Sequence, residues 1–146
     1  MTTHILSMTY PPKIEAVRRL ECRRTARLFN PENPFEEGDS VLIHGWAGKP
    51  YRSPWNWRLP KMPILPPIDL LAMEHTIGCW QNPITGTPLS RESVNISYVP
   101  WQDPLVDELA RLDGIDPPTG LEYKSVLERF HGRFVGEPVQ FQIVRW

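Results

Sequence analysis

The sequence lacks the features that would place the protein in a membrane or outside the cell. No apolar run approaches the roughly 18 residues of a transmembrane helix. The first residues lack the basic start and apolar run of a secretory signal. Two cysteines, Cys22 and Cys79, are too few for a disulfide framework. We therefore expect a cytoplasmic protein without membrane contacts.

Net charge is also nearly absent. The chain has 146 residues, with 16 Lys and Arg against 17 Asp and Glu, for a formal charge of −1. Proteins that coat a nucleic-acid duplex are usually basic, so any contact with nucleic acid should be local. A base, a nucleoside or a short single strand fits this balance better than a long duplex. No glycine-rich phosphate loop or complete metal-ligand pattern occurs, and we expect no cofactor and no metal.

Proline and tryptophan are abundant instead. The chain holds 17 Pro, about twice the usual share, and six Trp. Twelve of the prolines lie between Pro31 and Pro104, so this stretch should be rich in turns and extended backbone. The length suits one domain covering 1–146, with 46–100 as an elaborated insertion.

The order of periodic segments indicates an α+β fold. Helical spacing of Ile14 and Val17 predicts a short helix over 13–20. A capping-box pattern, Thr119 with Glu122 three residues later, predicts the start of the last helix. Strands are expected over 4–10, 22–29, 40–44, 68–79, 93–99 and 138–146, and a further helix over 104–112. This is not the alternation of a doubly wound sheet, and a small, partly open barrel flanked by helices is the economical arrangement.

Four stretches in this order resemble the ASCH domain family. The opening strand and helix lead to a basic strand with Thr25-Ala26-Arg27, and 35–43 is similar to the family pattern F-x-x-G-D-x-V. Residues 109–115 are similar to L-A-x-x-E-G-F, and a helix and closing strand follow over 123–146. The resemblance implies a PUA-like β-barrel of about five to six strands, flanked by two to three helices.

The resemblance also implies RNA or nucleoside handling. Small members of the family are amidohydrolases that deacetylate 4-acetylcytidine with a Lys, a Thr and a Glu. The Thr corresponds to Thr25 and the acid to Asp113, whereas the Lys position falls on Cys22. Without that amine, Thr25 lacks its obvious activating base, so binding is favoured over hydrolysis.

The candidate catalytic residues are therefore Thr25, Asp113 and Cys22. Asp113 would hold a substrate amine or act as a general acid or base. The neighbouring Arg23 and Arg24 would lower the pKa of the Cys22 thiol and populate a thiolate nucleophile. The alternative is a buried, inert cysteine. Arg24 and Arg27 are candidate ligand contacts, with Arg27 suited to a phosphate or carbonyl oxygen.

A second group of candidates interleaves aromatic and basic residues. Aromatic faces stack on bases for roughly 1–3 kcal/mol each, and adjacent cations bind phosphates. The alternative is that the Trp side chains fill the core beside a proline-rich loop. The candidate nucleic-acid contacts are Trp46, Lys49, Tyr51, Arg52, Ser53, Trp55 and Arg58.

These observations leave three functions open. The first is a module that binds RNA, single-stranded nucleic acid, a nucleobase or a nucleoside. The second is a nucleoside amidohydrolase with a 4-acetylcytidine-like substrate, or an RNase-like enzyme, that uses Thr25 and Asp113. The third is a protein-interaction module that uses the Trp- and Pro-rich segment.

Overall fold

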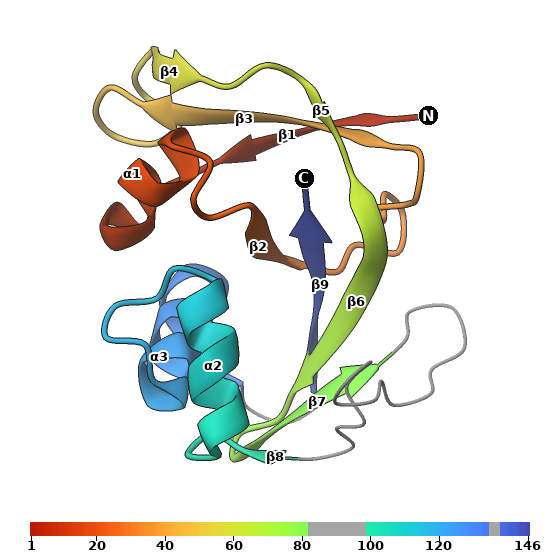
Figure 1. Ribbon diagram of the computed structural model, residues 1–146, viewed down its shortest axis with the longest axis vertical. Coiled ribbons are helices and arrows are strands. Elements are labelled where there is room, and N and C mark those ends of the chain that lie inside the picture. The colour runs from red at the N-terminus through yellow and green to blue at the C-terminus, as the bar shows by residue number, and fades with distance from the viewer. Residues whose placement is uncertain (82–98, 135–137) are drawn as a thin grey trace.

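The computed structural model describes residues 1–81, 99–134 and 138–146 and has an α+β fold. The described residues form three helices and nine strands, and the strands are divided between two sheets (Figure 1). They do not form one closed barrel, so the PUA-like barrel stays an expectation. Residues 82–98, within the expected insertion 46–100, lie outside the described residues. No helix in the described ranges is long and apolar enough to cross a membrane.

The first sheet is built around β3 (Ser40–Trp46). It pairs in parallel with β1 (Thr3–Ser7) and antiparallel with β4 (Trp55–Arg58) and β5 (Met62–Pro63). The two short strands lie in the stretch predicted to be rich in turns and extended backbone. Gly45 permits this pairing, because a Cβ there would lie 2.2 Å from the Trp57 indole nitrogen.

Helix α1 (Pro11–Arg18) connects the first sheet to the second. It begins two residues before the predicted start, with proline in the first turn, where no backbone donor is needed. Its buried residues are Lys13 and Val17, and Leu20 beyond its end is exposed. The helix therefore buries a charged side chain on its core-facing side.

The second sheet is antiparallel. Its order is β2 (Arg24–Leu28), β9 (Val139–Arg145), β6 (Leu65–Met73), β7 (Ile77–Gln81) and β8 (Val99–Pro100). The predicted strand over 68–79 is in fact the β6–β7 hairpin, which turns at polar residues 74–76. The predicted strand over 93–99 overlaps β8 only at Val99, and 93–98 lie outside the described residues.

Helices α2 (Pro104–Leu112) and α3 (Gly120–His131) pack together beside this sheet (Figure 1). The predicted cap of α3 is confirmed, because the Thr119 hydroxyl accepts the Glu122 backbone N–H at 3.2 Å. Asp103 caps α2 in the same way through the Leu105 N–H.

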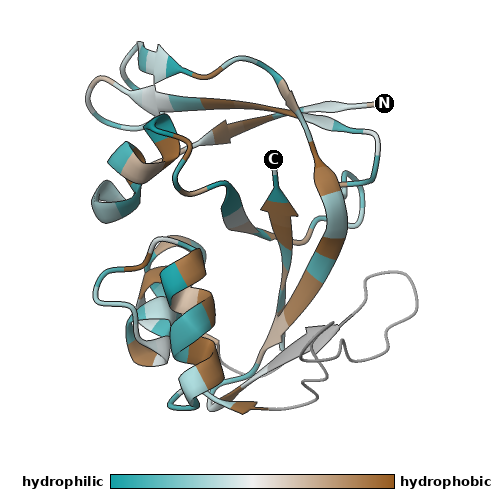
Figure 2. Ribbon diagram, viewed as in Figure 1, coloured by the Kyte–Doolittle hydropathy of each residue, from teal (hydrophilic) through white to brown (hydrophobic). Residues whose placement is uncertain are grey.

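Strand β9 contributes to both hydrophobic cores. Phe141 and Ile143 belong to the core under α2 and α3, whereas Val144, and Trp146 just after the strand, belong to the core between α1 and the first sheet. Figure 2 shows the apolar stretches of β9 and β6, the two strands at the middle of the molecule. The neighbouring strand β2 lies at the edge of the second sheet, where the two cores meet.

Candidate functional site

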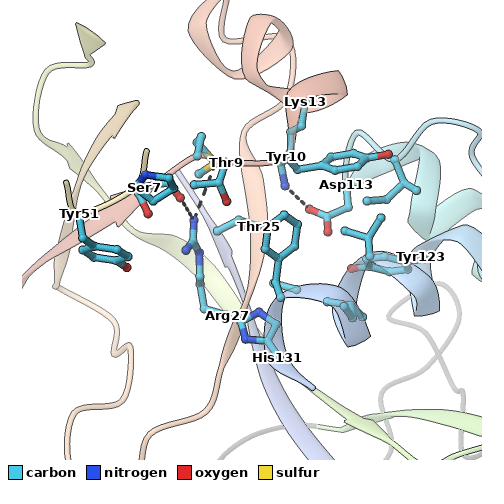
Figure 3. Close-up of a pocket in the computed structure, with 17 residues that line it drawn as sticks. Ser7, Thr9, Tyr10, Lys13, Thr25, Arg27, Tyr51, Asp113, Tyr123 and His131 are labelled. Atoms are coloured by element: carbon cyan, nitrogen blue, oxygen red, sulfur yellow. Dashed lines mark hydrogen bonds and ion pairs between the residues drawn. The ribbon is translucent and has the colours of Figure 1, made fainter. Parts of the chain in front are cut away.

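A pocket of about 320 Å³ lies beside the edge strand β2 (Figure 3). Its walls come from residues 7–10 after β1, from α1, from β2 and from one face of α3. Tyr51, from the β3–β4 loop, and Asp113, from the end of α2, complete the lining. The pocket thus unites segments that are as far apart in sequence as Ser7 and His131.

A buried ion pair, Lys13–Asp113, stands in the pocket wall. The Lys13 Nζ donates to Asp113 Oδ1 at 2.7 Å, and the two side chains are only 6% and 4% exposed. Lys13 projects from α1, and Asp113 is the residue at which α2 ends. Gly114 follows with φ +73°, and a Cβ there would lie 3.1 Å from the Lys13 side chain. Glycine therefore permits both the turn after α2 and the close approach of the lysine.

Thr25 and Tyr123 add two hydroxyl groups to the pocket. Both residues are buried, Thr25 on β2 and Tyr123 on α3. By distance and angle the Tyr123 hydroxyl makes no hydrogen bond in the described part of the chain, although the Asp113 carboxylate is close enough to act as its acceptor. Burial raises the pKa of Tyr123 well above its ordinary value, and the nearby Asp113 carboxylate raises it further through its charge and as a hydrogen-bond acceptor. The phenol therefore stays protonated and can donate a hydrogen bond to Asp113 or to a ligand.

Tyr10 fixes the turn that carries Asp113. Its hydroxyl donates to the Asp116 carbonyl oxygen at 3.0 Å and accepts the Asp116 N–H at 3.1 Å. Its ring lines the pocket. The same side chain thus orders the α2–α3 connection and offers an aromatic surface.

Arg27 is half-buried and lies at the end of the pocket opposite the Lys13–Asp113 pair. Its Nη2 donates to the Ser7 carbonyl oxygen at 2.6 Å and lies 3.8 Å from the Met8 sulfur. Its buried Nε has no partner among the described residues. Burial lowers the pKa of Arg27, although the guanidinium stays charged at neutral pH. Burial and the Arg27 charge likewise lower the pKa of His131, which lines the same end.

Of the two states considered for Cys22, a thiolate nucleophile and a buried, inert thiol, the structure favours the buried thiol. Burial raises the pKa of Cys22, and this effect outweighs the opposing effect of Lys13. The thiol lies 3.7 Å from the carbonyl oxygens of Arg24 and Leu112, to which it donates. Neither Cys22 nor Arg24 is part of the pocket lining. Both are buried beside it, which leaves Thr25 as the predicted nucleophile that faces the cavity.

The predicted aromatic and basic group is only partly brought to the pocket. Tyr51 reaches the lining, is 83% exposed and has φ +62°. The Trp46 ring lies 5.2 Å from the Tyr51 ring, and the Trp55 ring stacks 3.9 Å from His44. These rings belong to the β3–β4 hairpin, and of the group only Tyr51 touches the cavity.

The other members of that group lie away from the cavity. Ser53 shapes the β3–β4 loop, since its hydroxyl donates to the Lys49 carbonyl at 2.8 Å and accepts the Gly48 N–H at 3.0 Å. The basic side chains of the group are exposed and outside the lining: Lys49, Arg52 and Arg58.

Sequence reasoning missed the amine of the site. Lys13 precedes Val17 by one helical turn, so the two share the face of α1 that is buried. That spacing was the available signal for a buried lysine. Tyr123 was missed as well, although it lies three residues before Val126 on the apolar face of α3.

Comparison with protein-family models, with curated proteins and with solved structures finds no match to this chain. The resemblance to the ASCH family therefore rests on the residues quoted above.

Proposed function

We propose that this protein binds a nucleobase or nucleoside in the pocket beside β2, on an ASCH-like, PUA-like scaffold. The observation that carries the proposal is the buried Lys13–Asp113 pair inside a cavity of about 320 Å³. Buried charges in proteins are paired, as these two are with each other, and this pair in addition lines a cavity. Here they stand beside the protonated hydroxyl of Tyr123.

The ion pair offers the two kinds of contact that a base edge requires. Lys13 has further N–H donors beyond the one used by Asp113, and Asp113 has a second carboxylate oxygen. Adjacent donor and acceptor groups match the amine, imine and carbonyl groups of a Watson–Crick edge. A base placed against the pair would be read by hydrogen bonds at its edge.

The size and lining of the pocket support the same ligand. A volume of about 320 Å³ is at the lower end of the usual range for small-molecule sites, roughly 300–1,000 Å³. It suits one nucleoside and excludes a duplex. Tyr10, Tyr51 and Phe130 supply aromatic rings to the lining, and such rings stack on bases of any sequence. Tyr51 at the mouth of a concave site favours ligand binding over a flat protein-interaction surface.

Binding can be tested by thermal shift and calorimetry with the four common ribonucleosides and 4-acetylcytidine. We expect at least one to stabilise the wild-type protein. The double variant Lys13→Met/Asp113→Leu should abolish that response, because it removes both polar partners at once. The matched control, Glu108→Gln/Arg111→Gln, removes an exposed ion pair on α2 and should leave binding unchanged. Absence of any response in the wild type, or full response in the double variant, contradicts the proposal.

A nucleoside amidohydrolase is the second candidate, and the position of Lys13 favours it. The family-based expectation placed Cys22 at the lysine position, but Lys13 now supplies a pocket amine from α1. In this mechanism the Thr25 hydroxyl proton passes to Asp113 as the oxygen attacks the amide carbonyl. The leaving amine takes that proton, and water then hydrolyses the acyl ester on Thr25.

Mass spectrometry of 4-acetylcytidine separates the two candidates. Conversion to cytidine and acetate would establish the hydrolase, and Thr25→Val should then remove turnover while keeping binding. Stabilisation without conversion would support a binding module alone. Cleavage of short RNA, with no deacetylation, would indicate the RNase-like alternative.

A further inference from the structure

Arg27 is a cation in the pocket that forms no ion pair with any described carboxylate, although the Asp113 charge acts on it from a distance. Among the described lining residues Asp113 is the only acid, and it already pairs with Lys13 at 2.7 Å. The contacts of the Arg27 side chain are neutral: the Ser7 carbonyl at 2.6 Å and the Met8 sulfur at 3.8 Å. Its Nε is buried without a partner in the described part of the chain. The guanidinium therefore keeps unused donors.

A half-buried guanidinium without a counter-charge is an unfavourable arrangement in the empty pocket. Burial lowers the pKa of Arg27, and the Asp113 charge offsets only part of that effect. An anion placed against Arg27 would remove this cost and engage the planar donor fork. His131 lines the same end and offers a further ring nitrogen. This end of the pocket is thus complementary to a phosphate or carboxylate.

The position of Arg27 relative to the ion pair decides what kind of anion fits. Figure 3 shows Arg27 on the opposite side of Thr25 from the Lys13–Asp113 pair. Tyr51 also lies on the Arg27 side, and its high exposure marks that side as the open end. A ligand that spans the pocket would therefore have one neutral, hydrogen-bonding end inside and one anionic end near solvent.

We infer that the ligand is a nucleotide: its base meets Lys13–Asp113 and its phosphate meets Arg27. This inference rests on the proposed nucleobase site and adds the charge of the ligand. The phosphate belongs either to a free nucleoside monophosphate or to a phosphodiester in a single strand. Since the anionic end lies at the open side, a strand could continue outward from it.

Isothermal calorimetry can test the inference by comparing ligands that differ only in the phosphate. The probes are the four common ribonucleosides, their 5′- and 3′-monophosphates and the matching trinucleotides. We expect the wild-type protein to bind a monophosphate at least tenfold more tightly than its nucleoside. A trinucleotide that binds more tightly than either monophosphate identifies a strand as the source of the phosphate, and the reverse order identifies the free nucleotide.

Variants at Arg27 separate the role of its charge from that of the fold. Arg27→Gln should weaken monophosphate binding at least tenfold more than it weakens nucleoside binding, whereas Arg27→Lys should retain part of the phosphate advantage. Arg19→Gln is the control, because it removes an equal charge from an exposed position after α1 outside the lining. If Arg27→Gln does not fold, competition of inorganic phosphate against the monophosphate on the wild-type protein tests the same contact.

The outcomes distinguish this inference from the function on which it rests. Equal affinity of wild type for nucleosides and monophosphates, with no competition by inorganic phosphate, overturns the nucleotide inference and leaves the nucleobase site standing. An unchanged phosphate advantage in Arg27→Gln overturns the role of Arg27. Failure of all nucleosides, nucleotides and trinucleotides to bind overturns the proposed function as well.

Discussion

Removing Lys13 alone should be among the most destabilising single changes to this protein. Lys13→Met deletes one half of the ion pair and leaves the Asp113 carboxylate 4% exposed, without its charge partner. Loss of one partner of a buried pair typically costs about 3–5 kcal/mol, because the remaining charge has neither solvent nor counter-charge. Against a usual domain stability of about 5–15 kcal/mol, this is a large fraction.

The double variant supplies the decisive comparison. Lys13→Met/Asp113→Leu replaces both charges with apolar groups of similar size, which is often neutral or stabilising. Urea denaturation of wild type, Lys13→Met, Asp113→Leu and the double variant forms a double-mutant cycle. We expect each single variant to lose about 3–5 kcal/mol and the double variant to recover most of that loss.

If each single variant loses less than about 1 kcal/mol of unfolding free energy and the two losses add in the double variant, the reasoning is refuted. Such values are typical of a solvent-exposed ion pair.

Three further results are expected. Burial alone would raise the pKa of Asp39, but hydrogen bonds from His4 and from backbone N–H groups outweigh it and lower the pKa. The hydrogen bonds to the Asp39 carboxylate therefore stabilise the protein fully above the pKa that Asp39 has in the unfolded chain. This stabilisation is lost as the pH falls through the lower pKa of Asp39 in the folded state. Asp39→Asn should flatten that part of an acid denaturation curve. Gly45→Ala should cost about 1–3 kcal/mol in urea denaturation, because its Cβ would lie 2.2 Å from Trp57; unchanged stability would show that the ring can move. Since the pKa of Cys22 is raised, iodoacetamide at neutral pH should modify the Cys22 peptide far faster in unfolded than in folded protein, and equal rates by mass spectrometry would contradict its burial.

Local patterns in the sequence determined most of the secondary structure. Helix α2 has the predicted bounds, and the Thr119 cap of α3 forms as predicted. Caps and helix faces depend on residues three or four apart, so a single sequence contains the required information. The single strand predicted over 68–79 is wrong, because the segment forms two paired strands. An apolar run alone does not indicate where a hairpin turns, since the register is set by pairing with a partner strand.

Sequence similarity placed Thr25 and Asp113 among the candidates, and the structure brings both to one pocket. It did not provide the amine, because Lys13 and Asp113 are 100 positions apart and meet only when α1 packs against the end of α2. The same holds for Cys22, whose charged neighbours in sequence predicted a thiolate that burial prevents. Adjacent residues determine where a strand or helix begins. Which charges lose their solvent, and which partners they then find, depends on long-range packing that only the tertiary structure decides.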